Sequence, residues 1–139
     1  MKAIAQDFGP FLLGTTPAVV RLDPMTQGGL VLSVDVPQLT IIVGIQDSNW
    51  RGVVAVLVHE ALEYLLHSQG LSWSRSDDHL NAADARLFCF THGHWSVLCG
   101  QLGSFLVDCM PELSLYYAKH RADLELAEEI QAKEIKDEP

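Results

Sequence analysis

The sequence predicts an α+β fold, in which a small, mostly antiparallel sheet of three to four strands packs against three helices. β-Branched and apolar runs between turn residues occupy the first third of the 139 residues, which is typical of strands. A segment with apolar residues at helical spacing follows, and two further helical segments occupy most of the last third. Nearly half of the residues are hydrophobic, so a single domain of this length can bury a core of its own.

Strands are expected where short apolar runs lie between turn residues. These runs are AVVRL at 18–22, LVLSVDV at 30–36 and LTIIVGI at 39–45. The turn-rich DPMTQGG separates the first two, and Pro37 separates the second from the third. Because these connections are short, we expect an antiparallel meander. The aromatic run RLFCF at 86–90 is the expected fourth strand.

The first helix is expected within DSNWRGVVAVLVHEALEYLLHSQGL. Asp47 or Ser48 can cap its N-terminus, and Gly70 can end it in a left-handed conformation. Apolar residues recur along one side at the helical period, which predicts the face that packs on the sheet. These residues are Val54, Val58, Ala61, Leu62 and Leu65.

Two more helices are expected after residue 90. Thr91 can cap the second helix, HGHWSVLCGQLGSFLVDCM. Pro111 is expected to begin the third, because proline is favoured in the first turn of a helix. We therefore expect one α+β domain over 1–120, followed by a charged C-terminal helix and tail over 121–139.

The charge of the chain limits the classes of partner. Its formal net charge of −9 argues against a nucleic-acid-binding protein, because such proteins present basic surfaces. A protein partner that meets an acidic or helical surface fits this charge, and a homodimer is an alternative. Three cysteines without a C-x-x-C pair indicate reduced thiols in a cytoplasmic protein. The N-terminal residues show no signal-peptide pattern, and no apolar run is long enough to cross a membrane.

The stretch LVHEALEYLLH at 57–67 places polar side chains along one side of the first expected helix. At about 100° per residue, His59, Glu63 and His67 lie within roughly 80° of one another, and Glu60 lies just past that arc. His59 and Glu63 are one turn apart. Two side chains at this spacing can bind one metal ion, and the same spacing also occurs in ordinary surface pairs. Bulky apolar residues flank the stripe, so we expect a mostly buried helix, in which charged groups need partners or a metal.

The segment LTIIVGIQDSNWRGVVAVLVHEALEYLLH at 39–67 resembles the core of a zincin-like metallopeptidase. That core is a sheet strand, a short loop and a helix with an H-E-x-x-H motif, whose histidines bind zinc. The resemblance implies that His59 is the first metal ligand and Glu60 the general base. Glu63 replaces the second histidine of the motif, which becomes H-E-x-x-E.

The resemblance implies a third metal ligand from further along the chain. His92 is the expected residue, because it lies where a helix begins, and a helix N-terminus favours the neutral histidine that binds metals. His94 and His79 are the alternatives. We therefore expect a divalent-metal site of His59, Glu63 and His92. Zinc is the first choice, and manganese or iron are alternatives because a carboxylate makes the site harder.

Two functions follow from these features. The first is a zincin-like metal-binding protein, either a metal-dependent hydrolase or a degenerate and inactive relative of one, because Glu63 makes the metal a poorer Lewis acid. The second is a small acidic interaction protein that inhibits or scaffolds a partner without catalysis. A ligand site in the acidic loop SDDHL and a dyad of Cys89 or Cys99 with His92 are weaker alternatives. Serine-based hydrolysis is disfavoured because the chain has no G-x-S-x-G motif.

Overall fold

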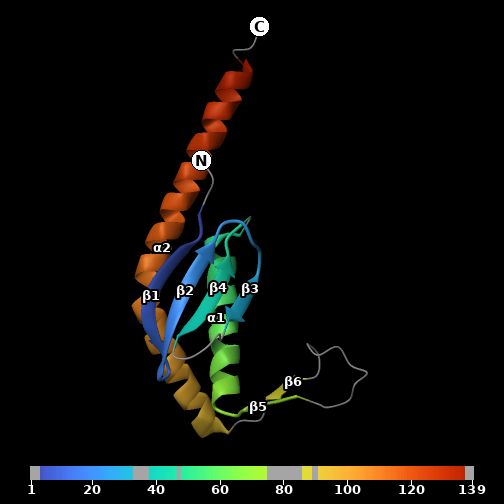
Figure 1. The fold of residues 1–139 in the computed structure, drawn as a ribbon, viewed down its shortest axis with the longest axis vertical. Helices are drawn as coiled ribbons and strands as arrows, with labels where there is room; N and C mark the ends of the chain where they lie inside the picture. Colours follow the sequence, from blue (N-terminus) through green and yellow to red (C-terminus); the bar gives the residue numbers. More distant parts are fainter. Residues whose placement is uncertain (1–3, 33–37, 47, 75–85, 89–90, 137–139) are drawn as a thin grey trace.

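The computed structural model is an α+β fold, in which a four-stranded sheet packs against helices (Figure 1). It describes residues 4–32, 38–46, 48–74, 86–88 and 91–136, and only the backbone of 32, 72–74, 86–88 and 134–136. The sheet contains β1 (Gln6–Leu13), β2 (Thr16–Asp23), β3 (Gly29–Leu32) and β4 (Leu39–Gly44). Helix α1 (Trp50–Ser68) follows β4, and α2 (His92–Lys136) follows a ribbon of β5 (Ser72–Ser74) and β6 (Arg86–Phe88). The expected α+β class is confirmed.

The sheet is mixed, with the strand order β1-β2-β4-β3. β1 and β2 form an antiparallel pair, as do β3 and β4, but β2 and β4 are parallel. The expectation of a simple antiparallel meander is therefore wrong. Its physical reason is burial: β2 and β4, in which no side chain is exposed, pair at the centre, and β3 is left at an edge with Leu30 half exposed.

Two strands differ from the expected ones. β1 was not expected at all, because Gly9 and Pro10 interrupt its pattern and most of its side chains are exposed. The register of β1 with β2 shifts between Phe8 and Phe11, and proline is tolerated at such an irregularity in an edge strand. The expected fourth strand exists at β6, but it pairs with β5 in a separate ribbon instead of joining the sheet. Residues 33–36 and 89–90 of the expected strands lie outside the described part of the chain.

Helix α1 ends as the sequence predicts, but its N-cap lies one residue beyond Ser48, the later of the two expected caps. Gly70 has φ +67°, the left-handed conformation expected after the helix. The N-cap is Asn49, whose side-chain oxygen accepts a hydrogen bond from the Gly52 amide at 2.9 Å, instead of Asp47 or Ser48. The buried face is also rotated slightly from the expected one, and consists of Val53, Leu57, Ala61, Leu65 and Leu66.

α2 is one helix of 45 residues, so the third helix expected to begin at Pro111 does not exist as a separate element. A proline inside a helix removes one backbone hydrogen bond, to the carbonyl four residues before it, and costs about 3 kcal/mol. Here both Pro111 and Val107 are exposed, so water can reach that carbonyl. The buried residues Cys109 and Leu113 lie on either side of the proline, and their packing on the core holds the helix continuous.

The core lies between the sheet and the two helices. Alternate residues of β2 and β4 join apolar residues of α1 and α2 in one buried cluster, with the Phe105 ring fully buried within it. α2 lies along β1, where Phe11 contacts Phe105 and Phe8 contacts Tyr116 edge to face. Tyr117 donates a hydrogen bond to the Ser48 carbonyl at 2.6 Å, which ties α2 to the residues before α1.

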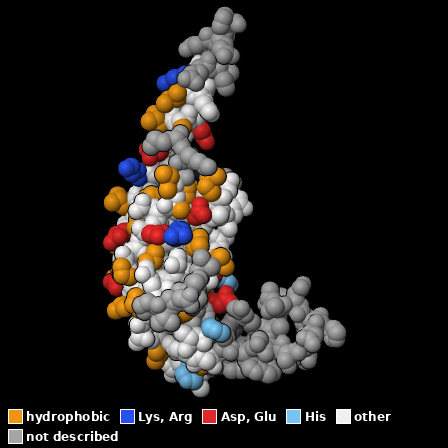
Figure 2. Space-filling model, viewed as in Figure 1, with side chains coloured by type: hydrophobic (Ala, Val, Ile, Leu, Met, Phe, Trp, Pro, Cys, Tyr) orange, Lys and Arg blue, Asp and Glu red, His pale blue; other side chains and the backbone are white. Residues whose placement is uncertain are grey.

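The C-terminal part of α2 extends beyond the sheet (Figure 1). Residues 121–133 are all exposed, and hydrophobic side chains remain at the surface along this extension (Figure 2). In the described part of the chain, no helix combines the length and the apolar character needed to cross a membrane.

Candidate functional site

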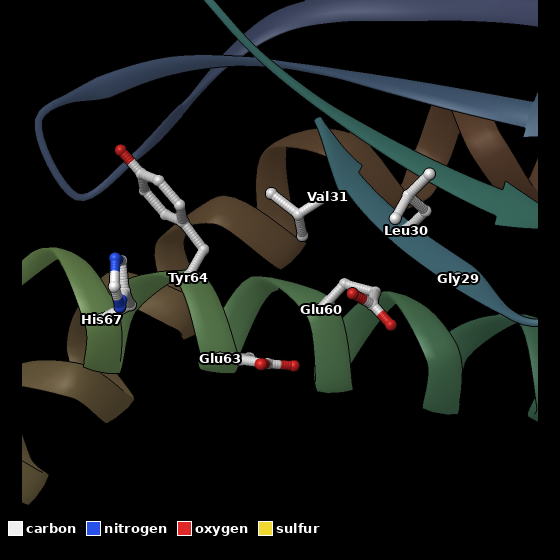
Figure 3. A pocket seen from close by; sticks show the side chains of 7 residues that line it. All are labelled: Gly29, Leu30, Val31, Glu60, Glu63, Tyr64 and His67. Carbon is white, nitrogen blue, oxygen red and sulfur yellow. The ribbon is translucent and has the colours of Figure 1, made fainter. Parts of the chain in front are cut away.

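A cleft of about 490 Å³ lies between α1 and the edge strand β3 (Figure 3). Its volume is within the range of about 300–1,000 Å³ that is typical of ligand sites. One wall is a row of α1 side chains at helical spacing and the other is the strand itself. The lining residues are Gly29, Leu30, Val31, Glu60, Glu63, Tyr64 and His67.

β3 approaches α1 closely because Gly29 has no side chain. A Cβ atom at Gly29 would lie 2.5 Å from Val56 Cγ1 and 2.7 Å from Glu60 Oε1, which is too close for non-bonded atoms. The Glu60 side chain consequently lies beside the strand, with its carboxylate next to Gly29 (Figure 3). This contact places a negative charge at the edge of the sheet.

The outer edge of β3 presents backbone hydrogen-bonding groups. β3 is the last strand of the sheet, and within the described residues no further strand pairs with it. The Gly44 amide donates to the Gly28 carbonyl at 2.7 Å, and residues 28 and 44 are opposite in the extended register of β3 with β4. Because hydrogen-bonded and outward-facing residues alternate in an antiparallel pair, Gly29 and Val31 direct their N–H and C=O groups away from β4. This edge is a template on which another extended strand can pair.

Tyr64 fixes the end of the cleft nearest the β1–β2 turn. Its hydroxyl donates a hydrogen bond to Thr16 Oγ1 at 2.9 Å, which connects α1 to the first residue of β2. Figure 3 shows the ring between His67 and Val31, so it adds an apolar surface to a cleft that Glu60 and Glu63 also line. An aromatic ring next to polar groups suits a site that holds side chains with an apolar stem.

The polar stripe of α1 is less buried than the sequence predicts. His59 Nε2 lies 3.5 Å from Glu63 Oε2, as the one-turn spacing implies, but the His59 side chain is 70% exposed and that of Glu63 is 31% exposed. His67 is exposed as well. Glu60 and Glu63 are half-buried and the two histidines are exposed, because α1 buries a face centred on Leu57 and Ala61 and leaves the stripe at its margin. Solvent can therefore satisfy these polar groups without a metal.

His92 and His94 lie at the start of α2. The Thr91 amide donates to His94 Nδ1 at 3.2 Å, and Thr91 Oγ1 accepts from the His94 amide at 3.4 Å. Thr91 therefore caps α2, as expected. His92 is the first residue of the helix and is exposed.

The expected metal ligands do not form a cluster. Among the described residues, no group of three or more His, Cys, Asp or Glu side chains is placed to hold a metal ion. His59 and Glu63 are adjacent, but His92 does not join them in such a group. His79, the alternative ligand in the acidic loop SDDHL, lies outside the described residues.

Neither of the two described cysteines offers a nucleophile within this cleft. Burial raises the pKa of the Cys109 thiol to about 12, so it is protonated at neutral pH. Cys99 is exposed on α2 and does not line the cleft. Cys89 lies outside the described residues.

Sequence reasoning identified the helical side of this cleft and expected a strand at 30–36, which overlaps β3, but it did not place that strand beside α1. The signal for this approach is the second glycine of DPMTQGG, a stretch whose composition is typical of a turn. A glycine inside a strand often marks the close approach of another part of the chain, and Gly29 has this role against α1.

Comparisons with known proteins return no match, whether the chain is scanned against protein-family models or searched against the curated proteins or the solved structures.

Proposed function

We propose that the cleft between α1 and β3 binds an extended polypeptide segment, which adds to the sheet as a strand beside β3. The observation that carries this proposal is the pair of outward-facing residues, Gly29 and Val31, which border a cleft of suitable size. In such strand addition, main-chain hydrogen bonds supply affinity and the pockets for alternate side chains supply specificity.

This proposal develops the second of the two expected functions, an acidic protein that acts through a partner. It also fits a zincin-like scaffold that holds a polypeptide without an assembled catalytic site. Two features favour binding over catalysis. Glu63 stands where the H-E-x-x-H motif has a histidine, and the described residues contain no three-ligand cluster.

Val31→Pro tests the strand addition directly. Proline removes the outward N–H of Val31 but no hydrogen bond to β4, and it is tolerated in edge strands. We expect it to weaken binding of a fluorescent seven-residue peptide of alternating threonine and valine by at least about tenfold in an anisotropy titration, because one hydrogen bond of about 1 kcal/mol is lost and the ring obstructs the edge. Val31→Ala keeps the N–H group and is the matched control.

Methylation of the peptide supplies an independent test. Methyl groups on the amides that face β3 are expected to abolish binding, whereas methyl groups on the alternate amides are expected to have little effect. Equal sensitivity of both methylated peptides, or binding to Val31→Pro as tight as to the parent protein, would show that the peptide does not add to β3.

A second candidate function is divalent-metal binding at His59 and Glu63, as the resemblance to zincin-like metallopeptidases implies. The observation in its favour is the 3.5 Å separation of the imidazole nitrogen and the carboxylate oxygen, one turn apart on α1. In this proposal Glu60 is the general base and the activity is metal-assisted hydrolysis. The third ligand expected at His92 is not grouped with His59 and Glu63 in the structure, so metal binding would have to bring it to them.

Calorimetric titration of the protein without a histidine tag tests this second candidate. Zinc, manganese and iron(II) salts are the probes, and His59→Ala is expected to abolish the binding of whichever metal binds. His120→Ala, on α2, is the control. Absence of binding, or binding that is unchanged in His59→Ala, would reject the metal site. Peptide binding that persists in EDTA would separate it from the strand addition.

A further inference from the structure

We infer that the polypeptide segment bound at β3 is basic, and that Glu60, with Glu63 beside it, selects lysine or arginine at alternate positions of the segment. This inference rests on the proposed strand addition and names the chemistry of the ligand.

The geometry of β3 determines which side chains of an added strand face α1. The Cβ direction of Gly29 points at Val56 and Glu60, so this face of the strand is the α1 face. Leu30, on the opposite face, is 52% exposed. Side chains directly opposite each other on neighbouring strands point to the same face, and the strands lie about 4.8 Å apart. Two residues of the bound segment, those that pair with Gly29 and Val31, would therefore direct their side chains over the cleft. They lie two positions apart in the segment.

The wall that these two side chains would meet is acidic. Glu60 is adjacent to Gly29, and Glu63 follows it along α1 in the direction of Val31 (Figure 3). None of the residues that line the cleft is lysine or arginine. Since Glu63 also pairs with His59, Glu60 is the stronger selecting group. The formal net charge of −9 adds a long-range attraction for a basic segment.

The apolar part of the cleft suits the same side chains. Val31 and Tyr64 line it together with the two glutamates. Lysine and arginine carry an apolar stem that can lie along such a surface while the charged end reaches a carboxylate. A glutamate at the same position of the segment would instead place like charges together, and a glutamine would gain no charge attraction.

Three peptides of equal length test the inference. Each is a fluorescent seven-residue peptide of alternating threonine and a variable residue, and the variable residue is lysine, glutamine or glutamate. Anisotropy titrations use the full chain in EDTA, at low and at high salt. We expect the lysine peptide to bind about 3- to 20-fold more tightly than the glutamine peptide at low salt, because each partly exposed charge pair contributes modestly. The difference is expected to shrink at high salt.

Variants of the protein test whether Glu60 and Glu63 cause the preference for the lysine peptide. Glu60→Gln is expected to remove most of the preference for lysine, and Glu60→Gln with Glu63→Gln to remove it entirely, while the binding of the glutamine peptide stays unchanged. Glu128→Gln, an exposed position on α2, makes the same change of net charge away from the cleft. It is expected to leave the preference intact.

The outcomes distinguish the two levels of the proposal. If none of the three peptides binds to the parent protein, or Val31→Pro binds them undiminished, the strand addition itself is wrong. If the lysine and glutamine peptides bind equally and Val31→Pro loses both, strand addition stands and charge selection is overturned. A preference that survives the double glutamine variant, or that falls equally in Glu128→Gln, also overturns selection by Glu60.

Discussion

Gly29→Ala is the most direct test of the contact that shapes the cleft. The φ angle of Gly29 is not in the left-handed region, so alanine suits its backbone conformation and the effect comes from the added methyl group. That group would lie 2.5 Å from Val56 Cγ1 and 2.7 Å from two atoms of Glu60. Glu60 can rotate away because its side chain is flexible, whereas Val56 is a β-branched residue on the helix and cannot.

The expected magnitude follows from two opposing effects. Overpacking of this kind lowers the free energy of unfolding by about 1–3 kcal/mol. Replacing glycine by alanine also restricts the unfolded chain, which raises stability by about 0.4–1 kcal/mol. We therefore expect a net loss of about 1–2 kcal/mol. Gly44→Ala should be more damaging, because its Cβ would meet the backbone carbonyl of Thr26, which cannot rotate away.

Urea denaturation of four proteins measures this effect: the parent, Gly29→Ala, Val56→Ala and the double variant. In the Val56→Ala background the obstructing methyl is absent, so Gly29→Ala is expected to be neutral or slightly stabilising. The resulting coupling energy of about 1–2 kcal/mol is within the range for residues in contact. Additive losses in the double variant would refute the proposed contact between β3 and α1, as would a stabilising Gly29→Ala in the parent.

Three further predictions concern the core, the thiols and the charged surface. Phe105→Ala is expected to lower the free energy of unfolding by about 3–5 kcal/mol in urea denaturation, because the ring is fully buried. Iodoacetamide is expected to modify Cys99 in the folded protein and spare Cys109, whose burial raises its pKa to about 12; peptide mass spectrometry locates the label. Hydrogen bonds from Arg21 at 2.6 and 2.9 Å lower the pKa of Asp7. This pair is expected to stabilise the fold by at most about 1 kcal/mol. The stabilisation is complete above the pKa of Asp7 in the unfolded chain, and it is lost as pH falls through the lower pKa of Asp7 in the folded protein. Denaturation of Asp7→Asn across a pH series measures that contribution.

Each of these predictions has a control or a contradicting result. Val107→Ala, at a residue of α2 that is 74% exposed, is expected to change stability by less than about 0.5 kcal/mol and is the control for Phe105→Ala. Similar alkylation rates of Cys99 and Cys109 in the folded protein would contradict the burial of the latter. An Asp7→Asn variant whose stability follows the same pH dependence as the parent would exclude a contribution from the ion pair.

Helix α1 was predictable because its signals are local. Apolar residues at helical spacing predicted its extent, and Gly70 predicted its end. The N-cap was missed by one residue, because Asp47, Ser48 and Asn49 all favour that position in sequence. Only the path of the chain after β4 determines which of them aligns its side chain with the Gly52 amide.

The strand pairing was not predictable, because it depends on contacts between distant residues. β2 and β4 pair in parallel although β3 lies between them in sequence, and a pattern of apolar runs does not reveal such an order. Pro111 shows the same limit for helices. Its local preference is to begin a helix, but the buried stripe that continues from Cys109 to Leu113 overrides that preference.

The candidate site was predictable in its residues and not in its surroundings. The one-turn spacing placed His59 beside Glu63, and the structure contains that pair. The extent of their burial depended on how α1 is rotated against the sheet, which helical spacing alone does not determine. The open edge of β3 was unpredictable for the same reason, since an edge is a property of the whole sheet.

The two carboxylates beside β3, Glu60 and Glu63, would also oppose aggregation of the protein. Two copies that paired through their β3 edges about a two-fold axis would bring Glu60 and Glu63 of one copy close to the same residues of the other. Like charges at such an interface oppose self-association. β3 is also only four residues long, so a pair of these edges would form few hydrogen bonds. The same carboxylates that would attract a foreign basic strand would thus repel an identical molecule, and an edge left open for a partner would not promote fibre formation.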